Sequence, residues 1–248
     1  EGIIPLYLFK YKKGIHAFLN LLFTTTTAII GFGFAFLLLK STEIVNENQF
    51  GVIHLFDFPL VFEVIISLLI LDLIGAYLVH FIEHKVPWMW KFHVVHHSDK
   101  NVDVTTGLRH HPGETVFRIL FTILGVYVSG ASIGMVMLYQ SISVLFAHIT
   151  HANISLPKNL DRVISYILVT PNMHKVHHHF KLPLTDTNYG NIFSIWDRLF
   201  GTYSYVDDSK SIVYGIDTHI NDKKIDSFSD LLLIPFKKIK KTNQSKFS

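Results

Sequence analysis

Residues 58–84 read FPLVFEVIISLLILDLIGAYLVHFIEH. This run is long enough to cross a bilayer as one helix, because such a helix needs about 20 mostly apolar residues. Glu63 and Asp72 interrupt it, and acids inside a membrane are costly and usually face a partner. The run ends in His80 and His84, which are one helical turn apart and therefore share a face. The stretch predicts a membrane span that presents imidazoles at one of its ends.

Two further apolar stretches predict more membrane helices. Residues 14–40 carry no Asp, Glu, Lys or Arg before Lys40. Residues 115–150 carry Arg118 as their only charged side chain, and they are too long for one helix in a normal bilayer. The small residues SGASIG at 129–134 favour a break near the middle. We therefore expect a helical hairpin there and about four transmembrane helices in all.

The composition agrees with an all-α integral membrane protein. The chain is 49% hydrophobic and 17% charged, with a mean hydropathy of +0.34, which is too apolar for an ordinary soluble domain. No linker divides it, so we expect a single membrane domain over residues 1–248. The apolar piece 160–170 is too short to span and is expected to be interfacial or buried. The chain begins with Glu1 rather than Met, and we expect the native N-terminus to be missing.

The residue types also exclude several classes of protein. There are no cysteines, which excludes thiolate-ligated haem, protein-held iron–sulfur clusters and thiolate zinc sites. The net charge of +3 does not indicate a nucleic-acid binder. The lysines gather near the two ends of the chain, which is a pattern typical of a membrane surface.

The charge distribution predicts the orientation in the membrane. The loop 41–57 between the first two spans carries Glu43, Glu47 and Asp57. Lysines instead flank the other ends of the spans: Lys10, Lys12, Lys13, Lys85, Lys91, Lys237, Lys238, Lys240 and Lys241. By the positive-inside rule both termini are cytoplasmic, and all the dense histidine motifs then lie on the cytoplasmic side. The basic tail 227–248 is expected either to lie on anionic headgroups or to move freely.

The histidine motifs predict metal binding. The segments HVVHH at 93–97 and HKVHH at 174–178 both have the form H-x-x-H-H. Positions i, i+3 and i+4 share a helix face, so each copy is expected to aim three imidazoles at one point. Imidazole is the commonest side-chain ligand for several transition metals. In FAHITHANI we favour His151 as a ligand and retain His148 as possible.

The phased histidines are roughly enough for two metal ions with four or five nitrogen ligands each. A histidine tract for surface metal scavenging would be continuous and loop-like rather than phased. The candidates are His80, His84, His93, His96, His97, His148, His151, His174, His177 and His178. The isolated His16, His54 and His219 are interpreted as ordinary surface or core histidines, and His179 points off the face of its neighbours.

Taken together, these motifs resemble the fatty acid hydroxylase/sterol desaturase superfamily of membrane di-iron proteins. Besides HFIEH, HVVHH and HKVHH, the segments PWMWKFHVVHHS, LRHHPGE, FAHITHANISLP and NYGNIFSIWDRLFGTY read like blocks of that family. The resemblance covers roughly residues 58–205. It implies a four-helix membrane stem under a cytosolic helical cap, which holds a histidine-ligated di-metal centre. The ligands it implies are His80, His84, His93, His96, His97, His151, His174, His177 and His178.

The resemblance also implies the chemistry. It implies two iron ions as cofactors, which zinc can replace in purified samples, with O2 as co-substrate and a membrane lipid as substrate. A separate electron donor of cytochrome or ferredoxin type is required, because the chain has no fused redox motif. The expected reaction is hydroxylation of an acyl, alkyl-ether, sterol or carotenoid C–H. A desaturase on the same site is one alternative, and a non-catalytic membrane metal carrier is another. The oligomeric state is not determined by the sequence.

Ligating histidines usually donate their second ring N–H to a carboxylate or a carbonyl. Asp72 precedes His80 by about two helical turns, so it is a candidate for such a partner, and a purely structural hydrogen bond is the alternative. Asp103, Glu114, Asn188 and Asp197 are further candidates for the groups that support the ligands.

Overall fold

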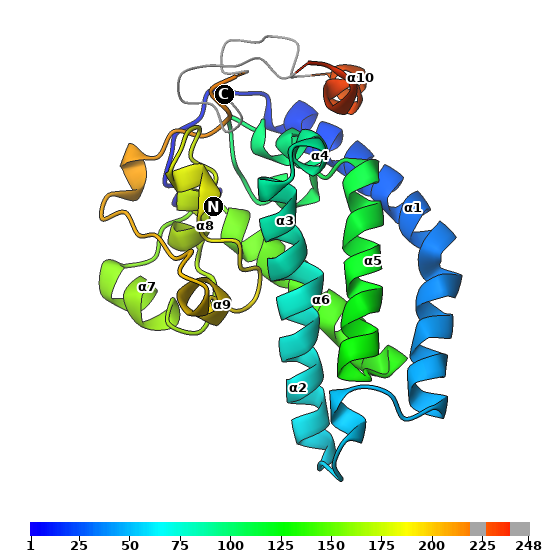
Figure 1. The fold of residues 1–248 in the computed structure, drawn as a ribbon. Coiled ribbons are helices and arrows are strands. Elements are labelled where there is room, and N and C mark those ends of the chain that lie inside the picture. The colour runs from blue at the N-terminus through cyan, green and yellow to red at the C-terminus, as the bar shows by residue number, and fades with distance from the viewer. Residues whose placement is uncertain (219–226, 239–248) are drawn as a thin grey trace.

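The computed structural model describes residues 1–218 and 227–238 (Figure 1). Throughout these residues the ordered elements are helices, and strand pairing is confined to the isolated bridges Leu168–Phe193 and His179–Tyr214. The α-helices are α1 (Lys13–Glu47), α2 (Leu60–Asp72), α3 (Val79–Lys85), α4 (Pro87–His97), α5 (Pro112–Ser129), α6 (Ile133–His151), α7 (Lys158–Ile164), α8 (Pro171–His177), α9 (Ile195–Leu199) and α10 (Phe228–Leu232). A π-helix (Leu73–Leu78) joins α2 to α3, and short 3-10 turns lie at Val52–His54, Thr106–Leu108, Leu184–Asp186, Ser209–Ser211 and Ile234–Phe236.

Three helical segments are long and apolar enough to cross a membrane: Lys13–His54, Leu60–Lys85 and Ile133–His151. The first segment contains the predicted span 14–40, and the second contains all but the first two residues of the predicted span 58–84. The second is one continuous rod, because the π-helix passes directly into α3 without a break. The predicted all-α membrane fold is therefore confirmed.

The predicted break within residues 115–150 is also confirmed, since α5 ends at Ser129 and α6 begins at Ile133. Gly130 adopts a left-handed backbone with φ of +83°, and a Cβ there would lie 2.6 Å from the carbonyl oxygen of Phe50. Only glycine fits such a turn without strain. α5 is not among the three segments above, because Glu114 and Arg118 lower the hydropathy of its first turns. The count of about four spans stays a prediction.

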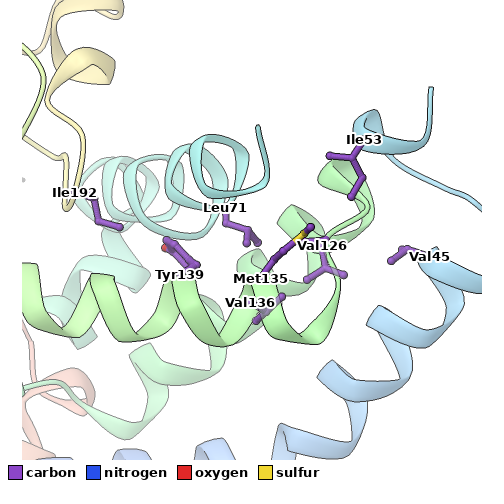
Figure 2. Packing of buried hydrophobic residues seen from close by; sticks show 9 residues of the cluster. Val45, Ile53, Leu71, Val126, Met135, Val136, Tyr139 and Ile192 are labelled. Carbon is purple, nitrogen blue, oxygen red and sulfur yellow. The ribbon is translucent and has the colours of Figure 1, made fainter. Parts of the chain in front are cut away.

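Apolar packing holds the lower half of the stem together (Figure 2). Leu71 of α2, Val126 of α5 and Val136 of α6 are buried against one another, and Val45 of α1 belongs to the same cluster. Ile192, from the segment before α9, reaches this cluster as well. The segment that precedes α9 is thus fixed directly to the membrane stem.

A second cluster fixes the end of the described chain. Leu231 and Ile234 are buried against Phe23 of α1 and against Trp90 and Val94 of α4. Within the run LLLIP, Leu231, Ile234 and Pro235 are buried, whereas Leu233 is 51% exposed. Between the two alternatives for the tail, this packing favours a fixed position for residues 227–238. The last ten residues of the predicted basic tail, and His219, lie outside the described residues.

The ends of four helices meet at one end of the stem. α3 and α6 reach this end with their last turns, and α4 and α8 lie across it (Figure 1). These helices carry the phased histidines of the sequence. The fold therefore gathers residues from positions 80 to 178 into one small region.

Candidate metal centre

The nine histidines that the resemblance implied as ligands form two buried clusters. In each cluster one ring nitrogen of every member lies within 4.8 Å of the others, and no member is more than 6% exposed. The five-histidine cluster contains His80, His84, His93, His97 and His177. The four-histidine cluster contains His96, His151, His174 and His178.

Each H-x-x-H-H motif contributes to both clusters. His93 and His97 of α4 belong to the five-histidine cluster, whereas His96 between them belongs to the other. The second motif is divided in the opposite way. His174 and His178 belong to the four-histidine cluster, whereas His177 belongs to the five-histidine cluster. The expectation that each motif aims three imidazoles at one point is therefore wrong. Successive helical residues are rotated by about 100°, so the rings at i+3 and i+4 diverge far enough to serve two centres.

The two clusters are direct neighbours. The rings of His97 and His178 stack with their centroids 4.7 Å apart, and those of His93 and His96 are 5.4 Å apart. Each of these pairs joins one cluster to the other. Two bound ions would therefore lie close enough together to act on the same substrate.

The ring nitrogens fit a cation better than they fit hydrogen bonds. The Nε2 atom of His151 lies 3.1 Å from Nε2 of His96 and 3.0 Å from Nε2 of both His174 and His178. One imidazole nitrogen can donate a single proton or accept through a single lone pair, so these three contacts cannot all be hydrogen bonds. Nitrogens about 2.1 Å from a shared metal ion are brought to such separations. The donor set therefore fits a metal.

Contacts on the other side of the rings fix which nitrogen faces inward. Nδ1 of His80 lies 2.8 Å from the carbonyl oxygen of Tyr189, and Nδ1 of His177 lies 2.7 Å from that of Thr187. Nδ1 of His151 similarly donates to the carbonyl of Ala147 at 2.6 Å. A proton on Nδ1 leaves the lone pair on Nε2, which is the arrangement that metal-ligating histidines usually have.

Burial keeps these imidazoles neutral. Removal from water lowers the pKa of His93 to about 4 and holds the pKa values of His96, His97, His174 and His178 well below the usual range. Charged imidazolium cannot ligate a metal, because its lone pair carries a proton. Near neutral pH the clusters therefore offer unprotonated nitrogen donors.

A partly buried ion network supports His93. Glu114 accepts from Nδ1 of His93 at 3.0 Å, from Nδ1 of His110 at 2.8 Å and from Nε of Arg118 at 2.8 Å. Arg118 also donates to Glu83 at 2.7 Å through Nη2. Both carboxylates are fully buried.

Two members of this network, Glu83 and Arg118, were not among the site residues predicted from the sequence. A signal exists for Arg118, because it is the only charged side chain in residues 115–150, and such charges usually have partners. The pairing of Glu83 with Arg118 could not be read from the sequence, because the two residues lie 35 positions apart on different helices.

His148 lies outside both clusters. Its Nδ1 is 2.9 Å from the carbonyl oxygen of Val104, whereas His151, three residues later on α6, is in contact with three other imidazoles. The preferred choice of His151 within FAHITHANI is the one that the geometry favours.

Three of the expected outer partners, Asp72, Asn188 and Asp197, bond to the backbone rather than to a ring. Asp72 accepts from the N–H groups of Ile192 and Phe193, both at 3.2 Å, and from the indole of Trp196 at 3.0 Å. Asp72 and His80 thus face the same segment, since His80 contacts Tyr189. The carboxylate holds this segment in place rather than bonding to a ring.

Asp197 and Asn188 act on the same segment. Asp197 accepts from the N–H groups of Tyr189 at 2.7 Å and Gly190 at 2.9 Å, and burial raises its pKa to about 6. Asn188 adopts a left-handed φ of 57° and exchanges hydrogen bonds with Ser204. Together they set the position of the Tyr189 carbonyl that orients His80.

Replacing Asp72 with asparagine is expected to lower activity by less than about tenfold, below the 10–100-fold cost of losing a direct partner of a ligand. The amide keeps one acceptor oxygen but cannot accept all three hydrogen bonds. Bound metal and turnover of the purified variant measure the effect. Unchanged values for both would show that Asp72 has only a structural role.

A cavity of about 440 Å³ adjoins the histidine clusters. His80, His93, His96, His151 and His174 line its inner end. Most of the remaining lining comes from α1, α5 and α6, and most of it is apolar. Ala28 of α1 and Gln140 and Val144 of α6 also line the cavity and are exposed, so it opens between α1 and α6 on the side of the stem.

Comparison with known proteins agrees with this site. The profile of the family described as fatty acid hydroxylase matches residues 64–202. The chain belongs to the fatty acid hydroxylase family. The matched region includes every member of both histidine clusters, the ion network of Arg118 and the segment that contains Asn188 and Asp197.

Several relatives are similar to more than half of this chain. Ornithine lipid hydroxylase OlsE of Rhizobium tropici is 31% identical over 148 residues, which are 59% of this chain and 43% of that protein. Alkylglycerol monooxygenase of Xenopus tropicalis is 32% identical over 147 residues, or 59% of this chain and 31% of the relative. A cholesterol 25-hydroxylase-like protein of Danio rerio is 28% identical over 127 residues, which are 51% of this chain and 49% of that protein. The matches thus span less than half of each relative, and no solved structure matches the chain significantly.

Proposed function

We propose that this chain is an O2-dependent lipid hydroxylase whose two histidine clusters hold two iron ions. The observation that carries the proposal is the contact between the clusters and the cavity. Members of both clusters line the inner end of a cavity that opens between membrane helices. A lipid chain that enters from the bilayer would place a C–H bond beside both clusters.

The residue types suit this chemistry. An alkyl C–H bond is inert toward acids, bases and nucleophiles, so its cleavage requires an oxidant made from O2, which bound iron would supply. The chain's own residues hold and shield that site. Buried neutral imidazoles provide the nitrogen donors, backbone carbonyls fix their orientation, and the apolar cavity limits the access of water.

The relatives support a lipid as substrate. Their names specify an ornithine lipid, alkylglycerols and cholesterol, which share membrane solubility rather than a headgroup. The cavity is large enough for part of such a molecule, since ligand pockets typically measure about 300–1,000 Å³. We propose that electrons come from a separate cytochrome or ferredoxin-type donor, and that the histidine end of the stem faces the cytoplasm, as the lysine distribution favours.

Two other functions fit less well. A desaturase would use the same clusters, but the names of the relatives specify hydroxylation or monooxygenation. A metal carrier is expected to bind its ion near the bilayer midplane. The clusters instead lie at the ends of the membrane helices, beneath the cap.

Mass spectrometry of all lipids in a host that expresses the chain tests the proposal. A His177→Ala variant, which lacks one member of the five-histidine cluster, is the control. We expect one lipid class to gain a single oxygen in the wild-type strain only. Loss of two hydrogens would indicate a desaturase, whereas the same oxygenated lipid in the variant would refute the assignment of the site. If the lipids do not change, purified iron-loaded protein with added reductant and the lipid classes of the relatives provides the deciding assay.

A further inference from the structure

The segment around α7 buries the polar side chains of Asp161 and Ser165 and exposes large apolar side chains. Leu160, Val163 and Ile167 are 49%, 69% and 60% exposed, whereas Asp161 and Ser165 are completely buried. A water-facing helix of a globular domain has the opposite arrangement, with its apolar stripe toward the core. The outer face of α7 is therefore built for surroundings other than water.

α9 extends this apolar surface. Leu199 and Phe200, at the end of α9, are 70% and 55% exposed. We name the whole surface the foot. It consists of Leu160, Val163, Tyr166, Ile167, Leu199 and Phe200.

The two parts of the foot form one rigid unit. The carbonyl oxygen of Ser165 accepts from the hydroxyl of Ser194 at 2.7 Å and from Nη2 of Arg198 at 3.0 Å. The guanidinium of Arg198 lies over the rings of Tyr166 and Tyr203, at 4.5 Å and 3.9 Å from their centroids. The exposed apolar side chains are therefore held in place by polar contacts on their inner side.

The foot packs against a membrane span. Phe200 stacks on Tyr77, with ring centroids 5.4 Å apart and planes inclined by 23°, and Tyr77 belongs to the Leu60–Lys85 span. α9 lies beside the rod formed by α2 and α3, and α7 lies on the outer side of α9 (Figure 1). Lipids around this span would therefore meet the foot as well.

The charges beside the foot favour a bilayer as the occupant. Lys158 and Arg162 are exposed next to its apolar side chains. Long basic side chains at such positions can extend toward headgroups while their methylene groups contact apolar surroundings. Tyr166 has the amphipathic ring that is common at the membrane interface.

We infer that the foot is inserted into the interfacial layer of the membrane and acts as a second attachment of the cap beside the spans. The foot is joined to the cavity, since Val169 donates to the carbonyl of Ile192 at 3.0 Å, and Gly190 and Asn191 line the cavity wall. Insertion of the foot therefore fixes the height of that wall relative to the lipids. This inference does not depend on the reaction that the centre performs.

The absence of cysteine makes a direct test possible. Val163→Cys and Leu199→Cys are each labelled with an environment-sensitive fluorophore in the otherwise unchanged chain, and Lys210→Cys on the exposed Ser209–Ser211 turn is the matched control. The variants are placed in phospholipid nanodiscs with and without doxyl-labelled lipids. Unchanged elution and circular dichroism confirm that each variant is folded.

We expect the labels at 163 and 199 to emit at shorter wavelength and to be quenched at least about twofold more than the label at 210, since interfacial segments reach about 5–10 Å into the headgroup and acyl boundary. Quenching equal to that of the control would overturn the inference. Blue-shifted emission without lipid quenching would also overturn it, because another protein surface, such as a second copy of the chain, would then cover the foot.

Discussion

His151→Ala is expected to empty the four-histidine cluster, leave the five-histidine cluster loaded and abolish lipid oxidation. Nε2 of His151 is the only nitrogen described in that cluster with three imidazole nitrogens within 3.1 Å. Its loss removes the shared point on which the other rings converge. Loss of a mere supporting partner costs about 10–100-fold, so loss of this ligand should lower turnover by more than about 100-fold.

The metal content of the purified protein, measured by mass spectrometry after loading with iron, checks this expectation. His148→Ala is a matched control, because it removes an imidazole from the same helix, three residues earlier, outside both clusters. The control should retain the metal content of the unchanged chain. Equal metal content in the two variants would contradict the assignment of His151 as a ligand.

Arg118→Gln is expected to lower the free energy of unfolding by about 3–5 kcal/mol, which is the usual effect of removing one partner from a buried ion pair. Glu83 and Glu114 are both fully buried and both bind this guanidinium. Without Arg118, two carboxylates would remain in an apolar region without a cation. His93 would also lose its fixed orientation, because the Glu114 that contacts it would be free to move.

Denaturant titration in detergent micelles, followed by circular dichroism, measures this effect. Lys40→Gln is the control, because Lys40 pairs with Glu43 at 2.6 Å on an exposed part of α1, and exposed pairs contribute about 0–1 kcal/mol. Adding Glu83→Gln to Arg118→Gln should restore part of the lost stability, since it removes one uncompensated charge. If Arg118→Gln were as stable as Lys40→Gln, the network would not contribute to the stability of the fold.

The sequence by itself predicted the membrane helices and the nine histidines that the fold gathers into two clusters. A segment within lipid must satisfy its backbone hydrogen bonds internally, which a helix does. The long apolar runs 14–40 and 58–84 are therefore predicted as membrane helices from length and composition alone. The break at 129–134 was equally well marked by its small residues. The nine histidines stood out because imidazoles repeated at helical spacing have few purposes other than metal binding.

Only the tertiary structure decided how these histidines are shared. Helical spacing predicts that three rings lie on one side of the helix. It does not predict whether they meet at one point, because the side-chain directions at i+3 and i+4 differ by about 100°. The division of His93, His96 and His97 between the clusters depends on where α6 and α8 lie against α4. The same holds for the choice of His151 over His148, which follows from the rotation of α6 about its own axis.

The partners of the ligands were likewise decided by the tertiary structure. Among the polar side chains that the sequence suggested, Glu114 contacts a ring, that of His93. The groups that contact His80 and His177 are instead the carbonyls of Tyr189 and Thr187. Every residue carries a backbone carbonyl, so none is distinguished in a sequence. A carbonyl becomes a specific partner only when packing brings it to a particular ring, and here the carboxylates of Asp72 and Asp197 hold the segment that does so.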